Sequence, residues 1–407
     1  MKKFDIVIIG SGTVGLTLAC LLAKHEISIA LIDAQPAPDT DIHTTYDTKV
    51  SAINHASQRI FSKIGVWAAM QQYRVSPYHH MKIWDIGSPA CIEFHREEIH
   101  QACLGYIIEH RILRQTLWQP LNTCENIQLY PKNTPQKLQE KKEHVEITLA
   151  DGQILATNLL VGADGQYSWV RHQTKMGAGN HDFHTTSSSQ ESAVVATLHS
   201  EYPHQETCFQ RFLEKGPVAL LPLADPHLVS LVWSTSTSEA NRLMSISADS
   251  FNDELGRALE KVLGHLTLCS DRIVFPLLRH QARHYVKSHI ALIGDAAHSI
   301  LPLAGQGLNA GLLDAACLAQ VILWAQNKHR PIDSIDTLRR YELWRKGENT
   351  AMRWAMEGFY SGFSSRNELV RHLRYVGFLG VQKLSRVKKY FIQRAAGLKG
   401  DLPDIAQ

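Results

Sequence analysis

Apolar residues at the start of the chain fall into short runs that predict two strands and a helix. Residues 4–9, Phe-Asp-Ile-Val-Ile-Ile, form a β-prone run typical of a strand that is buried on both faces of a parallel sheet. A helical spacing of apolar residues follows over 16–24, and a second β-prone run covers 28–33. These elements predict a βαβ unit at the N-terminus.

The rest of the pattern predicts an α/β protein that carries a mostly antiparallel insertion. Helices are expected over 50–70, 107–121, 248–263, 307–326 and most of 332–407. Strands are expected within 78–104, in a meander over 126–160 with a turn at Asp151-Gly152, and within the insertion 176–280. Buried strands at 158–162 and 289–293 are expected to belong to the parallel sheet.

Composition narrows the class of protein. The chain has 407 residues, of which 44% are hydrophobic, and this is enough for two or three domains with a sizeable core. A net charge of only +3 does not favour nucleic acid as a partner. The sequence holds no obvious run of about 18 apolar residues, so we expect no membrane-spanning helix.

Cysteine and histidine usage argues against a disulfide framework and against a metal centre. The seven cysteines are odd in number and form no C-x-x-C pair, which indicates a reducing compartment such as the cytoplasm. The pairs His79-His80 and His181/His184 lack a carboxylate or cysteine at a familiar metal spacing. We therefore expect no metal site.

The turn after the first strand is a dinucleotide-binding fingerprint. Its sequence, Gly10-Ser11-Gly12-Thr13-Val14-Gly15, is G-x-G-x-x-G placed between a strand and a helix. Glycine at these positions allows a tight turn, close approach to a pyrophosphate and close helix–strand packing. Asp33 closes the second strand, where an acid can accept a hydrogen bond from a ribose hydroxyl. A Rossmann-like domain that binds FAD or NAD is predicted.

Two later segments also place glycine and aspartate at the end of an expected strand. Gly162-Ala163-Asp164-Gly165 follows one expected strand, and Gly294-Asp295 follows another. The loop from His298 to Gly311 contains Pro302 and three glycines and leads into a helix, so its bare backbone suits contact with a flat ring. Together these segments indicate a cofactor that is contacted along its whole length.

At these motifs the chain resembles the FAD-dependent aromatic hydroxylases of the p-hydroxybenzoate hydroxylase fold. Within them it is most similar to the ubiquinone-biosynthesis hydroxylases, and the weaker match at 225–234 leans toward the 2-polyprenylphenol hydroxylase branch. The segments that match are Gly10 to Gly15, Lys49 to Asn54 with Ile64 to Trp67, Gly162 to Gly165 with Ser168 and Arg171, Phe275-Pro276-Leu277, and Gly294 to Gly311. They keep the family's order along nearly the whole chain.

The resemblance implies a role for each matching residue. Asp33 would hold the adenosine ribose, Asp164 and Gly165 would lie near the pyrophosphate, and Asp295 would bind the ribityl chain. The isoalloxazine would be covered by Pro302, Gly305, Gln306, Gly307, Leu308 and Asn309. The family usually has arginine where this chain has Lys49, and lysine loses the bidentate fork for a phosphate.

The implied domain organisation alternates between two units. The expected divisions are a FAD-binding domain at 1–75, 106–175 and 281–340, a substrate domain at 76–105 and 176–280, and a C-terminal helical region at 341–407.

The chemistry is likewise implied by the resemblance. Reduced FAD would form a C4a-hydroperoxyflavin with dioxygen and hydroxylate a polyprenylated phenol or quinol. His298 is the titratable candidate in the flavin loop for a catalytic base, against the alternative of a structural histidine, and Pro302 is the other catalytic candidate. There is no second G-x-G-x-x-G, so NAD(P)H or another electron donor is expected without a domain of its own.

A basic, aromatic tail follows residue 365. Such a segment suits a peripheral contact with the inner face of a membrane, or a place in a biosynthetic complex, and the alternative is a packing helix. A soluble aromatic-acid hydroxylase of the same fold stays open, as does a non-catalytic FAD-fold subunit. The sequence does not fix the oligomeric state.

Overall fold

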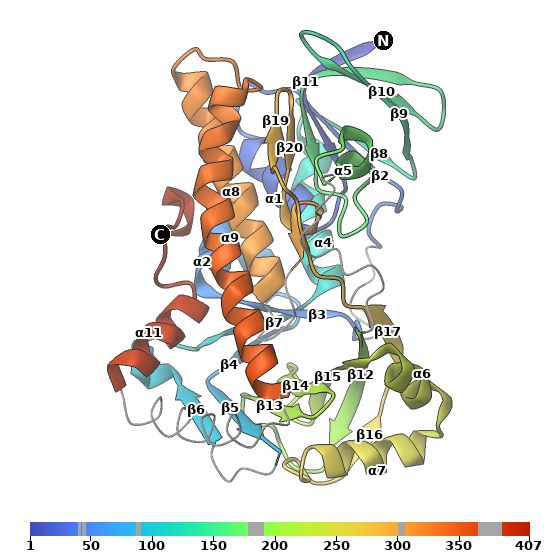
Figure 1. Ribbon diagram of the computed structural model, residues 1–407, viewed down its shortest axis with the longest axis vertical. Coiled ribbons are helices and arrows are strands. Elements are labelled where there is room, and N and C mark those ends of the chain that lie inside the picture. The colour runs from blue at the N-terminus through green and yellow to red at the C-terminus, as the bar shows by residue number, and fades with distance from the viewer. Residues whose placement is uncertain (40–41, 43–45, 87–90, 178–190, 300–305, 365–384) are drawn as a thin grey trace.

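The fold is described from a computed structural model that covers all residues except 40–41, 43–45, 87–90, 178–190, 300–305 and 365–384. The upper half of the molecule in Figure 1 is built on a parallel sheet with the strand order β19-β20-β11-β1-β2-β8. Its strands are β1 (Lys2–Ile9), β2 (Ile29–Asp33), β8 (Ile127–Pro131), β11 (Ile154–Gly162), β20 (Ile290–Leu292) and the antiparallel β19 (Val286–Lys287). Strands β9 (Pro135–Glu140) and β10 (Val145–Leu149) add to β11 in antiparallel fashion.

Helices cover this sheet and complete the main core. They are α1 (Thr13–Leu22), α2 (His55–Ile64), α3 (Trp67–Gln71), α4 (His110–Trp118), α5 (Trp169–Thr174), α8 (Gln306–Asn327) and α9 (Ile335–Ser364). Helix α8 packs between α1 and α9. Contrary to our expectation, its residues 307–327 are long and apolar enough to cross a membrane. However, 67% of the most apolar stretch of this helix is buried inside the fold. This burial is typical of a core helix.

A second sheet forms the lower half of the molecule (Figure 1). Its order is β16-β12-β15-β14-β13-β5-β6, with β17 also paired to β12. The strands are β5 (His80–Asp85), β6 (Cys91–His95), β12 (Glu191–Ser200), β13 (Thr207–Leu213), β14 (Gly216–Pro222), β15 (Leu228–Ser236), β16 (Leu266–Leu268) and β17 (Ile273–Pro276). Helices α6 (Thr237–Ser245) and α7 (Ala248–Ala258) pack on it around Phe251 and Trp233 and give it a core of its own.

A small sheet joins the two halves. It consists of β3 (Val50–Ile53), β7 (Gly105–Glu109) and β4 (Val75–Tyr78), and a two-stranded ribbon pairs β18 (His280–Gln281) with β21 (His298–Ser299). Ala52 and Ile107 of the small sheet pack with Cys208 and Leu223 of the lower sheet. This apolar cluster joins the small sheet to the sheet expected to hold substrate.

The C-terminal segment fastens the two halves from outside. Helix α11 (Ser385–Ala395) contacts the lower sheet through Lys388, whose Nζ lies 2.8 Å from Glu98 and over the Phe94 ring. At its other end Arg394 pairs with Glu348 of α9 at 2.5 Å. Residues 365–384 of the basic tail expected to face a membrane lie outside the described residues, and two cations of its described part are engaged within the protein.

The structure corrects several predicted boundaries. Residues 50–53 are the strand β3 rather than the start of a helix, because they pair with β7. The helix expected over 107–121 begins at His110, and helix α6 was not predicted. The strand β8 pairs in parallel with β2 instead of joining a meander. The domain divisions given above remain a prediction.

Candidate flavin site

In the G-x-G-x-x-G turn, Gly10 and Gly15 pack against backbone atoms, whereas Gly12 lies in open space. A Cβ on Gly10 would lie 2.3 Å from the Ala163 carbonyl oxygen, and one on Gly15 would lie 2.0 Å from the Gly10 carbonyl oxygen. Gly12 has nothing within 4 Å of its Cβ position. It also caps α1 without any side-chain hydrogen bond, so the first N–H groups of that helix are available to an anion.

Asp33 lies directly beside this turn. Its carboxylate accepts hydrogen bonds from the backbone N–H and the hydroxyl of Ser11, and from the backbone N–H of Gln35. Arg114, from α4, donates to the Ser11 hydroxyl at 3.3 Å and to the Pro36 carbonyl at 2.7 Å. Sequence analysis missed Arg114, since nothing in its own helix links it to a turn that lies a hundred residues earlier.

The second motif touches the first through backbone atoms. The Gly10 Cβ position is 2.9 Å from the Asp164 Cα, and Gly165 adopts φ +79° with open space around it. The Asp164 side chain accepts from the Ser168 hydroxyl at 2.5 Å and from the Val170 N–H at 3.0 Å. Burial raises the pKa of Asp164, and these hydrogen bonds oppose that effect. Its carboxylate therefore fixes the start of α5, while its backbone borders the phosphate turn.

The third motif packs on the same helix. A Cβ on Gly311 would lie 2.8 Å from a methyl group of Val14, and one on Gly294 would lie 3.3 Å from it. Val14 is thus the contact that brings the first and third glycine segments together. At the start of α8, Gly307 faces open space. Pro302 and Gly305 lie outside the described residues, and so does the side chain of Gln306.

Asn309 has a structural role that its motif did not reveal. Its amide oxygen accepts from the Asn54 backbone N–H at 3.0 Å and from the Ser57 hydroxyl at 2.8 Å. Its amide nitrogen donates to the Ala52 carbonyl at 2.8 Å. The side chain therefore ties the start of α8 to the β3–α2 connection. Leu308, the neighbouring predicted residue, packs in part against the main core.

Asp295 and Lys49 carry opposite charges near these motifs. Asp295 is exposed to solvent, yet enclosure by protein raises the pKa of its carboxyl, while His298 and Lys49 act in the opposite direction. Lys49 is also exposed, and its Nζ lies 5.4 Å from the centre of the Phe275 ring. His110 bonds Ser51 at 2.6 Å, and burial together with Lys49 lowers its pKa to about 3. His110 is a further residue that the motifs did not indicate.

His298 does not stand alone in the flavin loop. Its Nε2 lies 2.5 Å from Asp314 of α8, and Arg345 of α9 lies 2.8 Å from the other oxygen of that carboxylate. Burial would raise the pKa of Asp314, but His298 and Arg345 outweigh it and hold that pKa at about 2. His298 is 3% exposed, and its Nδ1 has no hydrogen-bond partner among the residues that the structure describes. Its proposed role as a base remains a prediction.

These observations fit FAD. Gly12, Gly165 and Gly307 come from three distant parts of the chain, and each leaves a space that a Cβ would occupy. The uncapped N-terminus of α1 suits the pyrophosphate, and the exposed Asp295 carboxylate suits a polyol. The described residues contain no group of three or more potential metal ligands.

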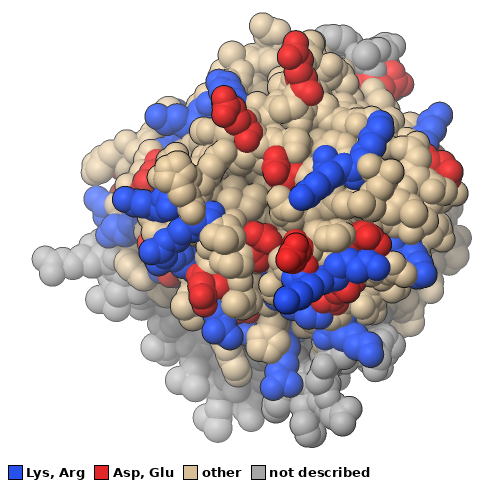
Figure 2. Space-filling model, turned by 90° about the horizontal axis from the view of Figure 1, so that it is seen from above, with Lys and Arg blue, Asp and Glu red and all other residues tan. Residues whose placement is uncertain are grey.

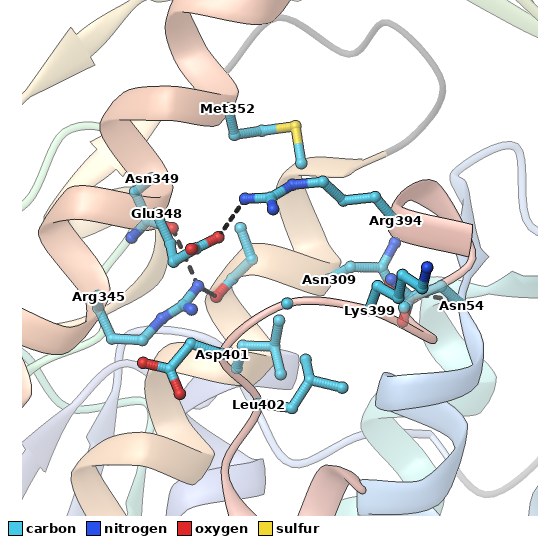
Figure 3. A pocket seen from close by; sticks show the side chains of 14 residues that line it. Asn54, Asn309, Arg345, Glu348, Asn349, Met352, Arg394, Lys399, Asp401 and Leu402 are labelled. Carbon is cyan, nitrogen blue, oxygen red and sulfur yellow. Dashed lines mark hydrogen bonds and ion pairs between the residues drawn. The ribbon is translucent and has the colours of Figure 1, made fainter. Parts of the chain in front are cut away.

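A separate recess of about 60 Å³ lies between α8, α9 and the C-terminal segment (Figure 3). Arg345, Arg394 and Glu348 line it. Arg345 is bound to Asp314 and Arg394 to Glu348, so these charges are already satisfied within the protein. We therefore assign no ligand to this recess.

The fold and the site together define an FAD-dependent monooxygenase of the aromatic hydroxylase type. A family model described as an FAD binding domain matches residues 3–345. Among solved structures, PqsL of Pseudomonas aeruginosa, a probable FAD-dependent monooxygenase, shares the fold at a TM-score of 0.76 and 20% identity, covering 93% of this chain and all of its own. The p-nitrophenol 4-monooxygenase PnpA of Pseudomonas putida DLL-E4 gives 0.76 at 15% identity, covering 98% and 99%.

Curated relatives narrow the family further. The 3-demethoxyubiquinol 3-hydroxylase of Escherichia coli is 32% identical over 97% of this chain and 98% of its own length. Ubiquinone hydroxylase UbiL of Rhodospirillum rubrum is also 32% identical, covering 97% and 90%. The human ubiquinone biosynthesis monooxygenase COQ6 is 31% identical, covering 97% and 92%. The chain belongs to the ubiquinone hydroxylase family of FAD-dependent monooxygenases, which confirms the resemblance and the predicted fold class.

Proposed function

We propose that this protein hydroxylates the aromatic ring of a polyprenylated phenol or quinol during ubiquinone biosynthesis. The observation that carries the proposal is the full-length similarity to relatives named for ubiquinone hydroxylation, and the glycine segments that suit a flavin cofactor support it. Reduced flavin would supply the activated oxygen, with NAD(P)H or another electron donor as the source of electrons.

The residues of the chain would bind the cofactor and exclude water. Gly12 and the start of α1 would receive the pyrophosphate, Asp33 the adenosine ribose, and Asp295 the ribityl chain. Lys49 would place a positive charge beside the anionic parts of the cofactor. His110 would stay neutral there, since its pKa is about 3.

The apolar cluster between the two halves supports a hydrophobic substrate. Ala52, Ile107, Cys208 and Leu223 are buried there, and partly buried Met81, Val50 and Leu221 adjoin them. These apolar side chains would suit a prenylated ring placed beside them.

Quinone profiling tests the proposed function. A strain that lacks the gene is expected to accumulate a prenylated intermediate with one hydroxyl group too few, and its mass and ring substitution would name the step. The purified FAD-loaded protein is expected to reoxidise faster in the presence of that intermediate. If quinone levels do not change, the pathway is wrong, and turnover of small phenols without lipid would favour the aromatic-acid alternative.

A peripheral contact with the inner face of a membrane is part of the proposal. The exposed side chains Tyr390 and Phe391 of α11 and the neighbouring Lys389 offer apolar and cationic groups of the kind that seat a helix in the interface. Charges of both signs intermingle on the upper end of the molecule (Figure 2), and we propose α11, which lies toward the other end, for the contact. Replacing Tyr390 and Phe391 by serine is expected to weaken binding to anionic liposomes, and unchanged binding would remove the membrane contact.

A further inference from the structure

The outer face of α9 lacks charge for four turns. Leu343 is 78% exposed and Trp354 is 64% exposed, and Gly347, Ala351 and Gly358 lie on the same exposed face. Their spacing of four, four, three and four residues keeps them in one stripe of the helix. Figure 1 shows α9 along the front of the molecule, with no described element in front of it. An exposed helix face normally carries charged residues, so this stripe indicates a contact surface.

The residue sizes on this stripe suit another helix better than a lipid surface. The Cβ positions of Gly347 and Gly358 have nothing within 4 Å, so another backbone could approach them closely. Two glycines and an alanine offer little area for insertion into a membrane. The alternation of large Leu343 and Trp354 with these small residues is typical of interlocking helix pairs.

The stripe is complementary to itself when two copies run antiparallel. With a twofold axis between residues 350 and 351, Leu343 of one copy faces Gly358 of the other, and Trp354 faces Gly347. Each large side chain therefore meets a glycine, and Ala351 lies at the axis. We propose that α9 forms the interface of a homodimer in which two copies pair antiparallel through this stripe.

The charges beside the stripe fit the same arrangement. Lys346 and Glu357 lie on one flank of α9, partly exposed, and 11 residues apart in the sequence. In the antiparallel pair this flank faces its own copy, which brings Lys346 of each chain close to Glu357 of the other. Within one chain Glu357 lies 3.8 Å from Arg353, and the Lys346 ammonium donates to the Arg283 carbonyl. Two helices paired over 16 residues overlap by about 24 Å, so we expect a dimer with a dissociation constant on the order of micromolar.

Cysteine cross-linking tests the geometry. With the exposed Cys269 replaced by serine, Ala351→Cys is expected to form a disulfide between copies of the full-length FAD-loaded protein under mild oxidation. Arg339→Cys, on the same helix, would lie about 35 Å from its counterpart and is the matched control. Equal cross-linking of both variants, or none at Ala351→Cys, would overturn the proposal.

Sedimentation across the micromolar range tests the contacts. Trp354→Ala is expected to weaken the dimer at least about tenfold while FAD content stays unchanged. Lys346→Glu alone or Glu357→Lys alone is expected to weaken the dimer, because each places like charges opposite one another. The double variant is expected to restore the dimer, because each chain then again offers one cation and one anion to its copy. A monomer at every concentration would overturn the proposed dimer, and so would dimers that are insensitive to both Trp354→Ala and the charge reversals.

Discussion

At the scale of single residues, the three glycines of the first turn have separable roles. Gly10 and Gly15 are required by backbone packing, because a Cβ at either would meet a carbonyl oxygen at 2.3 Å or less. Gly12 has an extended backbone, with φ −69° and ψ 174°, and open space around it. A side chain would fit at Gly12 in the protein without a ligand, so we expect the cofactor rather than the fold to require glycine there.

This difference predicts opposite outcomes for two substitutions. Gly12→Val is expected to leave the melting temperature of the FAD-free protein unchanged and to lower FAD affinity at least about a hundredfold, since the added methyl groups fill the phosphate space. Gly15→Ala is expected to destabilise the fold by several kcal/mol, on the order of 3. Thermal melts of the apoprotein and flavin fluorescence titrations check both. A stable Gly15→Ala protein would contradict the packing role.

His280 gives the stability a pH dependence. It is buried, and burial together with Arg171, whose Nη1 lies 3.1 Å away, lowers its pKa to about 4. Between pH 6.5 and 4 the unfolded chain binds a proton that the folded histidine does not. Stability should therefore fall with falling pH in this window, by about 1.4 kcal/mol per unit from this group.

Urea denaturation at several pH values checks that sign. His280→Gln is expected to flatten the decline between pH 6.5 and 4 relative to the parent protein. The exposed His25→Gln is the matched control and should leave the slope as it was. An identical slope in His280→Gln would show that another group is responsible.

At the scale of elements, a buried charge cluster fastens α8 to α9. Asp314 is fully buried and accepts from His298, Arg345, the Asn349 amide and the Gly294 N–H. All four donors converge on one carboxylate, which fixes the long helix that begins beside the expected flavin ring. Removing the carboxylate would leave a buried guanidinium without its partner.

Asp314→Ala is therefore expected to destabilise the protein by about 3–5 kcal/mol. Asp336→Ala, at the exposed first turn of α9, is the control and should cost less than about 1 kcal/mol. Chemical denaturation measures both. Similar losses in the two variants would show that the cluster does not hold the helices together.

The elements that could be predicted from the sequence are those with a long, local apolar pattern. Strands β1, β2 and β11 and helix α8 carry apolar patterns long enough to be recognised from local sequence, and all are present. Residues 50–53 form a strand only because they pair with β7, more than fifty residues later. Helix α6 has buried only Ala240 and Leu243, so its apolar pattern was too sparse to predict it.

At the scale of the whole molecule, the candidate site is assembled from segments that lie far apart in the chain. Glycine motifs could be predicted because each one has a local signature. Asn309 binding Ala52 and Asn54, or Arg114 binding Ser11, could not be predicted, because both contacts depend on the completed fold. The sequence thus indicates where FAD would lie, while the residues that hold the motifs in place emerge only in three dimensions.

Because the three glycine segments come from residues 10–15, 162–165 and 294–311, bound FAD would add a further link between parts of the chain that already meet through packing and backbone hydrogen bonds. A ligand that binds only the folded state stabilises it by about 2.7 kcal/mol at a hundredfold excess over its dissociation constant. We therefore expect FAD to raise the melting temperature of the whole chain in a single transition. The Gly12→Val protein should show no such rise at the same concentration, and an equal rise in both proteins would place the flavin elsewhere.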